Sequence, residues 1–447
     1  MAFNKQALLA EIREQYLEED NGRPWIVAFS GGKDSTTLLM LVWEALTSLT
    51  PVDWKKRPVY VICNNTLVEN PKVLKFVNSQ LEAIRKRAVE LGMPIQVDHT
   101  TPRLDDSFWV NLIGRGYPAP NNMFRWCTER LKISPTTQYI KEKIDKDGEV
   151  IILIGTRSDE SSSRAASIKR HEIKGERLRK HPLPNAMAYA PIKDMTTDEV
   201  WKYLEFSKNP WTSDKNHELR TLYLNGSGGD CPIVMDNSTP SCGNSRFGCW
   251  VCTVVKRDRS MEALIDNGED WMVPLMRVRD FLYRTIDRTN EHYNPEEYRM
   301  PIRRNKADGI GPYWPKYRYH ILKLVLEAQK AAAKEDPNNQ LITLQELSAI
   351  QIVWNRDHIY EHTVGDAYRE VFGENVEFGQ TALELDNEKQ LLKEVCVEHP
   401  DDVLLINRLL NAQKNKGLLL KKLGLQNDLE NILQESVRPT FTKFDNY

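Results

Sequence analysis

Two groups of residues in this 447-residue chain have the types and spacing to do chemistry. The first is the string Ser-Gly-Gly-Lys-Asp-Ser at residues 30–35. Adjacent glycines let a backbone turn tightly and approach a ligand closely. The string lies between an apolar run and a helical pattern, so the start of that helix offers free N–H groups to phosphate oxygens. These features predict a phosphate-binding loop made of Ser30, Gly31, Gly32, Lys33, Asp34 and Ser35.

The residue after the lysine distinguishes this loop from a Walker A motif. A Walker A loop has Ser or Thr there, whereas this chain has Asp34. The Asp34 carboxylate could hold Mg²⁺ directly or through water. We therefore expect a different type of nucleotide loop, with a magnesium ion beside it.

The second group consists of four of the seven cysteines, which fall within 22 residues of one another. Their spacing is C-x10-C-x6-C-x2-C, and the final pair lets two thiolates reach one metal from a single turn. Four thiolates suit either Zn²⁺ or an iron–sulfur cluster, and the spacing leaves both open. The predicted metal ligands are Cys231, Cys242, Cys249 and Cys252.

The elements that must position these residues alternate between strand and helix. Short apolar runs at 25–29, 59–63, 95–97 and 149–154 are typical of buried strands, and residues 71–91 have helical periodicity. This alternation predicts βαβ units and a mostly parallel sheet. Ligand sites in such α/β folds lie at the carboxyl ends of the strands, where the glycine loop stands.

Composition divides the chain into three expected parts. Residues 1–205 form the α/β part and begin with a helix that stops at Asn21-Gly22. Residues 206–315 are rich in Gly, Pro, Cys and Trp and have little periodicity, and residues 316–447 are helical in character. Charged residues make up 28% of the chain and hydrophobic residues 40%, which excludes a wholly disordered or fibrous protein.

The start of the chain is acidic and amphipathic and lacks a signal-peptide core, and the apolar runs are too short to cross a bilayer. We therefore expect a cytoplasmic protein without a membrane partner. The net charge of −2 argues against a protein that coats nucleic acid by bulk charge. Residues 164–180 nevertheless carry a net +5 and residues 360–402 a net −9. Each segment is either a solvated face or an interaction surface, the first for a polyanion and the second for a basic partner.

Several motifs resemble known families. The string at 30–35 resembles the PP-loop of the ATP-pyrophosphatase superfamily, whose members split ATP between the α and β phosphates and transfer AMP. Residues 125–135, 155–164 and 191–201 resemble segments of its phosphoadenosine phosphosulfate reductase branch. The resemblance covers about residues 20–205. It implies a PP-loop (adenine nucleotide alpha hydrolase-like) parallel sheet, joined here to a cysteine-rich cluster region and a helical C-terminal region.

The same resemblance extends the nucleotide site beyond the loop. The fork-shaped guanidinium groups of Arg157 and Arg164 suit phosphate oxygens. Asn65 and Thr66 follow the second predicted strand, where such folds hold the adenosine, although an Asn-rich turn is the alternative interpretation. Outside the loop, the predicted nucleotide-binding residues are Asn65, Thr66, Lys132, Gly155 and Arg157.

Cys127 stands where cluster-bearing members of the reductase branch have two adjacent cysteines, but Thr128 follows it here. We expect Cys127 to handle sulfur as a thiolate, its pKa lowered by Arg125, Arg130 or Lys132. The alternative is a buried structural thiol. The predicted catalytic residues are Lys33, Asp34, Cys127, Arg157 and Arg164.

The cysteine insert, residues 310–318 and the helical tail together resemble the DndC family, the sulfurtransferases of bacterial DNA phosphorothioate modification. This resemblance implies that the chain replaces a DNA phosphate oxygen with sulfur, using ATP and Mg²⁺. Trp250 beside the C-x-x-C pair and the reductase-like first part of the chain favour a [4Fe–4S] cluster at the cysteines, with Zn²⁺ as the alternative metal. It implies DNA, other Dnd proteins and a cysteine desulfurase as partners.

Three other functions stay open. The first is a tRNA thiolase that uses the same loop. The second is a sulfonucleotide reductase, which the ending Thr-Lys-Phe-Asp-Asn-Tyr disfavours because it lacks a catalytic cysteine. The third is a non-catalytic iron–sulfur scaffold or regulator, and the intact Lys33, Asp34 and Ser35 argue against it.

Overall fold

The computed structural model confirms the predicted α/β architecture. A six-stranded sheet has the order β3-β2-β1-β4-β6-β5, in which only the short β5 pairs in an antiparallel way. The strands are β1 (Trp25–Ala28), β2 (Val59–Asn64), β3 (Ile95–Thr100), β4 (Val150–Leu153), β5 (Arg179–Lys180) and β6 (Ala186–Tyr189). The structure describes residues 3–18, 22–173, 175–226, 248–289, 294–301, 310–357, 359, 362–376, 390–397, 399–400, 402–417 and 429–433.

The chain forms two compact units. Unit 1 consists of Met1–Phe108 and Pro120–Tyr283, and unit 2 of Trp109–Ala119 and Arg284–Tyr447. The three parts expected from composition, 1–205, 206–315 and 316–447, are a different division and stay a prediction.

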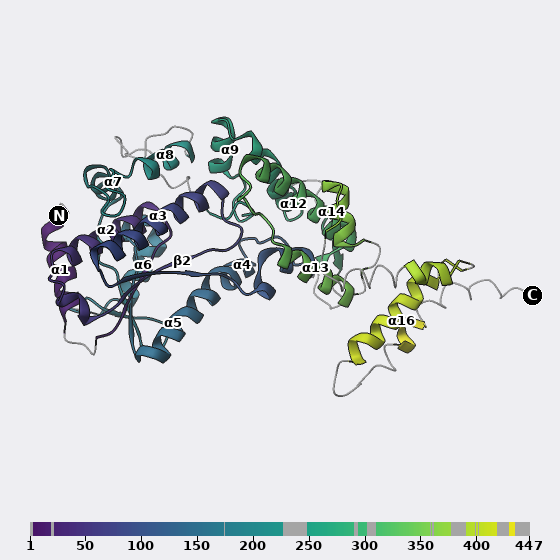
Figure 1. Cartoon of the computed structure of the whole chain (residues 1–447), viewed down its shortest axis with the longest axis horizontal. Coiled ribbons are helices and arrows are strands. Elements are labelled where there is room, and N and C mark those ends of the chain that lie inside the picture. The colour runs from purple at the N-terminus through teal and green to yellow at the C-terminus, as the bar shows by residue number, and fades with distance from the viewer. Residues whose placement is uncertain are drawn as a thin grey trace, which may run out of the picture. The chain divides into compact units, whose positions relative to one another are not determined.

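Helices cover both faces of the sheet in unit 1 (Figure 1). Side chains alternate along each strand: Trp25 and Val27 join the core beneath α1, α2, α3 and α7, whereas Ile26 joins the core beneath α5. The described helices of this unit are α1 (Lys5–Leu17), α2 (Lys33–Thr47), α3 (Pro71–Leu91), α4 (Trp126–Thr128), α5 (Ser134–Asp147), α6 (Ser162–His171), α7 (Thr197–Phe206), α8 (His217–Gly226), α9 (Arg259–Asp266) and α10 (Val273–Arg284).

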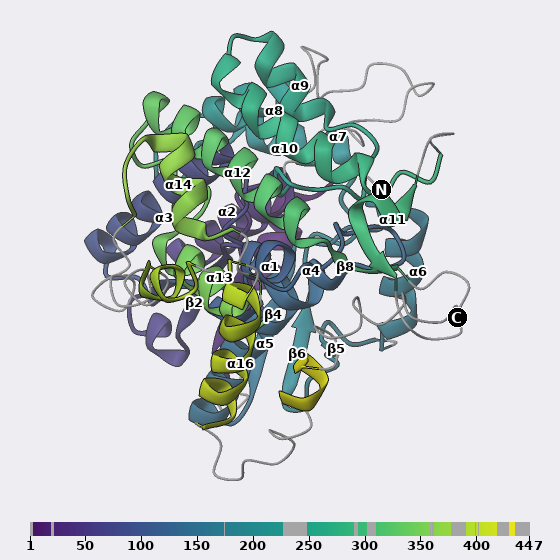
Figure 2. The same cartoon turned by 90° about the vertical axis from the view of Figure 1, so that its right-hand side faces the viewer.

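Three features of unit 1 differ from the sequence expectation. The segment expected to have little periodicity contains α8, α9 and α10, and α8 packs against α9 (Figure 2). The first helix ends at Leu17, before Asn21-Gly22. The strand β6 was not expected, because its Ala-Met-Ala-Tyr sequence is short and poor in β-branched residues.

Unit 2 is mainly helical, as predicted for the C-terminal region. Buried indole groups join its segments: Trp109 Nε1 donates to Leu341 O at 2.7 Å, and Trp354 Nε1 to Ile113 O at 3.0 Å. No helix in the described part of the chain is long and apolar enough to cross a bilayer. The described elements are a π-helical turn (Val110–Gly114), α11 (Pro295–Tyr298), β7 (Arg299–Pro301), β8 (Ile310–Tyr313), α12 (Pro315–Glu335), α13 (Leu344–Arg356), α14 (Val364–Phe372) and α16 (Asp402–Gly417).

The strand order places the glycine loop at a topological switch point. From β1 the chain moves outward to β2 and β3, and then returns to the other side of β1 as β4. Trp25 therefore pairs with both Val59 of β2 and Ile151 of β4. The loops that follow β1 and β4 diverge here, and such a crevice is where open α/β sheets bind ligands.

Gly31 shows why the loop needs glycine. Its φ is +72°, and a Cβ at this position would lie 2.4 Å from Val77 Cγ2 of α3. Gly92, at the end of α3, also has a positive φ of +65°, but a Cβ there would meet nothing within 4 Å. A side chain at Gly92 would therefore cause backbone strain alone, whereas a side chain at Gly31 would cause both strain and a steric clash.

We expect Gly31→Ala to lower the free energy of unfolding by about 3 kcal/mol and Gly92→Ala by about 1 kcal/mol, because only the first adds overpacking to strain. Urea denaturation measures both. The Gly31→Ala/Val77→Ala double variant should cost less than the sum of its single changes, because the clashing methyl group is gone. Strict additivity would contradict the predicted clash.

Candidate functional site

The glycine loop is closed by its own hydroxyl groups. Ser30 N donates to Ser35 Oγ at 3.2 Å, and Ser35 Oγ donates to Gly32 O at 3.0 Å. Gly32 is the N-cap of α2 and provides no side-chain cap, so the loop leads directly into the first helical residue, Lys33. The predicted loop residues are thus brought together at the positive end of a helix, which suits an anion.

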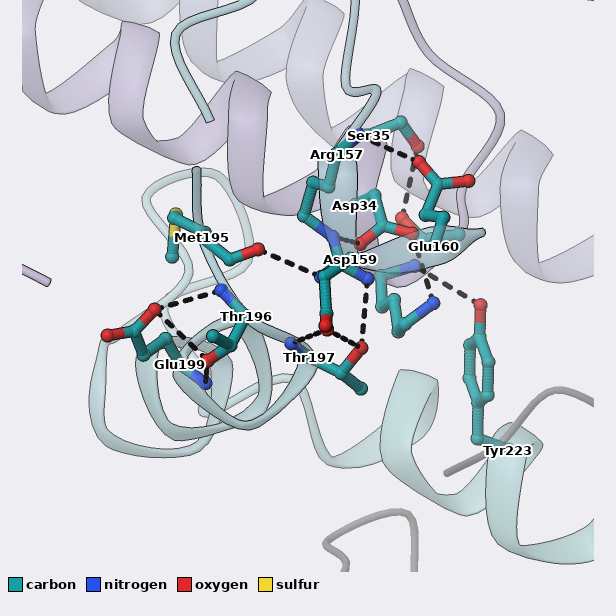
Figure 3. A network of polar contacts seen from close by, with 12 residues as sticks. Asp34, Ser35, Arg157, Asp159, Glu160, Met195, Thr196, Thr197, Glu199 and Tyr223 are labelled. Carbon is teal, nitrogen blue, oxygen red and sulfur yellow. Dashed lines mark hydrogen bonds and ion pairs between the residues drawn. The ribbon is translucent and has the colours of Figure 1, made fainter. Parts of the chain in front are cut away.

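The Asp34 carboxylate lies between two cations. Lys33 Nζ is 3.0 Å from Asp34 Oδ2, and Arg157 Nε donates to Asp34 Oδ1 at 2.7 Å (Figure 3). The expected magnesium role of Asp34 stays a prediction, and in the structure each carboxylate oxygen is held by a cation. A metal ion at Asp34 would therefore compete with Lys33 and Arg157 for the carboxylate oxygens.

Arg157 is buried, and its side chain is 1% exposed. Beyond Asp34, its guanidinium donates to Met195 O at 3.0 Å and to Thr197 Oγ1 at 3.1 Å, and it lies 3.4 Å from Asp159 Oδ2 (Figure 3). The sequence suggested phosphate as its partner. In the structure the protein's own groups occupy these donors, and they lock the glycine loop to the start of α7.

Asp159 completes this network from the turn after β4. Its Oδ2 accepts hydrogen bonds from Thr197 N at 2.8 Å and Thr197 Oγ1 at 2.9 Å. Burial by itself would raise the pKa of Asp159, but these hydrogen bonds and Arg157 hold it below its usual value. The start of α7 is fixed independently by a capping box between Thr196 and Glu199.

Gly155 has a steric role in the same turn. A Cβ on Gly155 would lie 3.1 Å from the backbone C and O atoms of Asp34 and 3.3 Å from Ser35 N. A side chain here would crowd the backbone at the start of α2, and glycine avoids this. The structure therefore places Gly155 beside the loop, as the family motif suggested.

Tyr223 of α8 is a neighbour of the loop that the sequence did not reveal. Lys33 N donates to the Tyr223 hydroxyl at 3.3 Å, and Lys33 Nζ lies 6.0 Å from the ring centroid (Figure 3). Tyr223 also packs edge-on against Trp201 of α7. The Tyr223 hydroxyl oxygen thus accepts a hydrogen bond from Lys33 N–H, a donor that was expected to bind a phosphate oxygen. The only sequence signal was the helical spacing of Leu219 and Tyr223 in a segment read as irregular.

The basic strip at 164–180 begins beside the turn after β4. Lys169 and Arg170 are exposed on α6, and Arg179 donates to Thr156 Oγ1 at 3.5 Å. The backbone of Arg164 lies in α6, whereas its side chain falls outside the described part of the structure. Its predicted phosphate contact therefore stays a prediction.

The C-x-x-C pair is attached to the residues that follow β2. Glu69 and Cys249 form an antiparallel bridge, and Trp250 N donates to Val68 O at 3.0 Å. Cys252 N donates to Cys249 O at 3.0 Å, so both thiols lie on one turn. Trp250 between them is fully buried. This indole anchors the turn to unit 1.

Thr66 and Lys132, expected at the nucleotide, lie with these thiols. Thr66 is completely buried, and its Oγ1 is 2.8 Å from Glu69 Oε1 and 3.5 Å from Cys249 Sγ. Lys132 Nζ lies 4.0 Å from Glu69 Oε1, and the negative potential of Cys249 is the main cause that raises the pKa of Lys132. Asn65 supports the turn, because its side chain accepts from Leu67 N at 2.9 Å. Their nucleotide roles stay predictions.

Cys127 faces the same group of thiols from α4. Burial raises the pKa of the Cys127 thiol, the neighbouring Cys252 raises it further, and Thr128 and Lys132 offset only part of this. Lys132 thus acts in the expected direction, but the expectation that cations bring the pKa of Cys127 below its usual value is wrong, because burial outweighs them. Two of the three suggested cations are engaged elsewhere: Arg130 pairs with Asp106, and Arg125 bonds to Asn122.

A metal site at these cysteines can be judged only in part. Cys231 and Cys242 lie outside the described residues, and within the described ones no group of three or more His, Cys, Asp or Glu side chains is placed to hold a metal. Cys249 and Cys252 share one turn, which fits two soft donors to one metal centre. Burial raises the pKa of Cys249 to about 12, so metal binding there must displace a proton.

Arg279 of α10 holds the peptide that follows the C-x-x-C pair. This guanidinium is almost fully buried and donates to Cys252 O at 3.2 Å, to Lys256 O at 2.8 Å and to Val255 O. A buried cation that binds three carbonyl oxygens fixes the course of this loop. No sequence motif pointed to Arg279.

A model of the phosphoadenosine phosphosulfate reductase domain matches residues 24–255. An uncharacterized protein of Methanocaldococcus jannaschii is 29% identical over 189 residues, which are 42% of this chain and 33% of that protein. The chain therefore spans about a third of the length of this relative.

Three solved structures show weak similarity. The phosphoadenylyl-sulfate reductase of Candida auris in its phosphate complex is 11% identical, with 46% of this chain and 87% of that one covered and a TM-score of 0.25. The FMN adenylyltransferase of Candida glabrata with FMN and an ATP analogue is 14% identical, with 55% of this chain and 73% of that one covered and a TM-score of 0.30. The U34-tRNA thiolase NcsA of Methanococcus maripaludis with its [4Fe–4S] cluster is 16% identical, with 63% of this chain and 79% of that one covered and a TM-score of 0.29. At these values none of them bears on substrate or cofactor.

The Arg157 network predicts a stability effect. Arg157→Gln should lower the free energy of unfolding by about 3 kcal/mol, because it removes a buried cation from Asp34 and leaves other polar groups unpaired. Arg170→Gln is the control, since Arg170 is exposed on α6, and it should change stability by less than about 0.5 kcal/mol. Urea denaturation followed by tryptophan fluorescence compares them. Equal stability of the two variants would contradict the network.

Proposed function

The chain belongs to the phosphoadenosine phosphosulfate reductase domain family, and on that premise we propose that it is an ATP-dependent sulfurtransferase acting on DNA. In this proposal it replaces one non-bridging oxygen of a backbone phosphate with sulfur, the activity implied by the resemblance to the DndC family. One observation carries the proposal: the glycine loop at residues 30–35 and the thiols of Cys249 and Cys252 lie at the same edge of one parallel sheet.

The sheet register supports this juxtaposition. β1 and β2 are paired neighbours, with Ala28 opposite Ile62, so their carboxyl ends lie side by side. The glycine loop begins at Ser30, and the residues that hold the C-x-x-C turn begin at Thr66. A phosphate activated at the loop would therefore lie near the thiols, and such proximity is what a sulfur transfer requires.

The first proposed step activates the DNA phosphate. A non-bridging oxygen of the DNA phosphate attacks the α-phosphorus of ATP, the bond from that phosphorus to the bridging oxygen breaks, and pyrophosphate leaves. Lys33 and the N–H groups at the start of α2 stabilise the pyrophosphate charge. Asp34 would hold the magnesium ion of ATP, and Arg157 orients the Asp34 carboxylate.

The second proposed step delivers sulfur. Cys127 receives sulfur as a persulfide from a cysteine desulfurase, and the terminal sulfur attacks the activated DNA phosphorus. AMP leaves with the original oxygen, so the DNA phosphorus is now joined to Cys127 through two sulfur atoms. An added thiolate attacks the Cys127 sulfur and forms a mixed disulfide with it, while the original sulfur–sulfur bond breaks and its electron pair leaves with the DNA phosphorothioate. A second thiolate reduces the mixed disulfide and regenerates Cys127. Lys132 lies among the thiols and would stabilise the charged form of the sulfur.

For the cofactor, we propose a [4Fe–4S] cluster on Cys231, Cys242, Cys249 and Cys252, with Zn²⁺ as the alternative. When bound by four cysteines, a cluster would supply one-electron redox chemistry at a potential set by its surroundings. The described pair, Cys249 and Cys252, provides two of the four donors on one turn. Other Dnd proteins are the proposed partners for selecting the DNA site.

Sulfur analysis of nucleic acids tests the function. Cells with the wild-type chain should contain phosphorothioate dinucleotides in digested DNA, and Lys33→Ala should reduce them by about 100-fold or more because pyrophosphate loses its cation. Lys86→Ala is the control, since Lys86 is exposed on α3. Mass spectrometry of DNA and tRNA digests measures both products. Loss of tRNA thionucleosides instead of DNA sulfur would support a tRNA thiolase and overturn the proposal.

Anaerobic purification tests the cofactor. We expect a brown protein with about four irons per chain, and Cys249→Ser should lose most of this iron. Cys396→Ser is the control, because Cys396 is a buried thiol in unit 2. Iron and sulfide assays with a visible spectrum give the readout. A colourless wild-type protein loaded with zinc would overturn the cluster.

A further inference from the structure

Two loops of unit 1, residues 120–125 and residues 253–257, meet next to Cys127 and Cys252 in the chain. We call these two loops together the cysteine rim. Thr253 Oγ1 donates to Pro120 O at 2.5 Å, which joins the two loops directly. Cys127 follows the first loop by two residues, and Cys252 precedes the second by one. The cysteine rim therefore adjoins two of these thiols along the chain.

The first loop of the rim exposes two large apolar side chains. Met123 is 94% exposed and Phe124 is 46% exposed. The turn that presents them is ordered by Asn121, whose Oδ1 accepts from both Met123 N and Phe124 N at 2.9 Å. The turn therefore leaves Met123 almost entirely and Phe124 about half in solvent, so part of the Phe124 ring stays available to a ligand.

The rim is also cationic. Arg125 and Lys256 are exposed, and among the described residues neither has an acidic partner. Arg257 differs, because it pairs with Glu262 at 2.8 Å. Neither loop contains Asp or Glu, and the acid-free stretch around the first one extends over residues 107–128. The rim therefore exposes two cations that have no acidic partner among the described residues.

We propose that the cysteine rim binds one strand of the DNA substrate, with Phe124 stacked on an unpaired base and Arg125 and Lys256 on the adjoining phosphates. A cation favours the phosphates, and an exposed aromatic ring favours the face of a base. Stacking requires a base that has left the duplex, so the rim binds a locally opened strand. This inference rests on the proposed function and locates its substrate beside the thiols.

Fluorescence anisotropy with a labelled single-stranded DNA 20-mer and the matching duplex tests the inference on the full chain. The wild-type chain should prefer the single strand. Phe124→Ala should weaken that binding about tenfold, because one stacked base is lost. Phe206→Ala is the matched control, since Phe206 is 76% exposed elsewhere in unit 1, and it should leave binding unchanged.

The charge contribution is tested by salt dependence. Arg125→Ala/Lys256→Ala should reduce the slope of log affinity against log salt by about 1.4, which is about 0.7 for each phosphate contact on a single strand. Lys86→Ala/Lys141→Ala, which removes two exposed lysines of unit 1, should leave the slope unchanged. An unchanged slope in the rim variant would overturn the phosphate contacts.

The outcomes separate this inference from the function on which it rests. If the wild-type chain produces DNA phosphorothioate but Phe124→Ala binds single-stranded DNA as tightly as Phe206→Ala, the inference fails and the function stands. If the rim variants keep DNA binding but lose their complex with a cysteine desulfurase, the rim docks a protein and the inference again fails. If DNA phosphorothioate is absent while the rim variants lose affinity for tRNA, the DNA function fails and the rim binds RNA.

Discussion

The buried pairing of Arg157 with Asp34 is the contact on which the arrangement of the site depends. A guanidinium removed from water must have its donors satisfied, and here the partners come from the start of α2, the turn after β4 and the start of α7. Three segments that are distant in sequence are therefore held at fixed positions around the glycine loop. Gly31 and Gly155 permit this because each lets another segment pass where a side chain would clash.

The sequence predicted the parts of the fold that follow from local pattern. The runs at β1, β2, β3 and β4 were identified because buried parallel strands are nearly continuous in apolar residues, and α3 was placed at its observed ends by its periodicity. The glycine loop could also be identified from the sequence, because its functional residues are adjacent in the chain. Its position between β1 and α2 is confirmed, whereas its binding of phosphate stays a prediction.

Contacts between distant residues could not be predicted in this way. Thr66 and Cys249 are 183 positions apart, and nothing in either segment shows that the two touch. The Arg157 guanidinium was identified as a hydrogen-bond donor for phosphate. The residue type alone does not specify whether it donates to phosphate or to other groups of the protein. The pKa of Cys127 was misjudged for a related reason: nearby cations are visible in a sequence, whereas burial and a second thiol are properties of the folded chain.

The attachment of the C-x-x-C turn has a consequence for how the protein is assembled. Cys249 and Trp250 bond to residues 68 and 69, which take their positions only once β2 is in the sheet. Closing so long a loop before the sheet exists would cost entropy without any compensating contact. The position of Cys249 and Cys252 therefore depends on that of β2. A change that displaces β2 would therefore also displace this pair of thiols, although the two segments are far apart in the sequence.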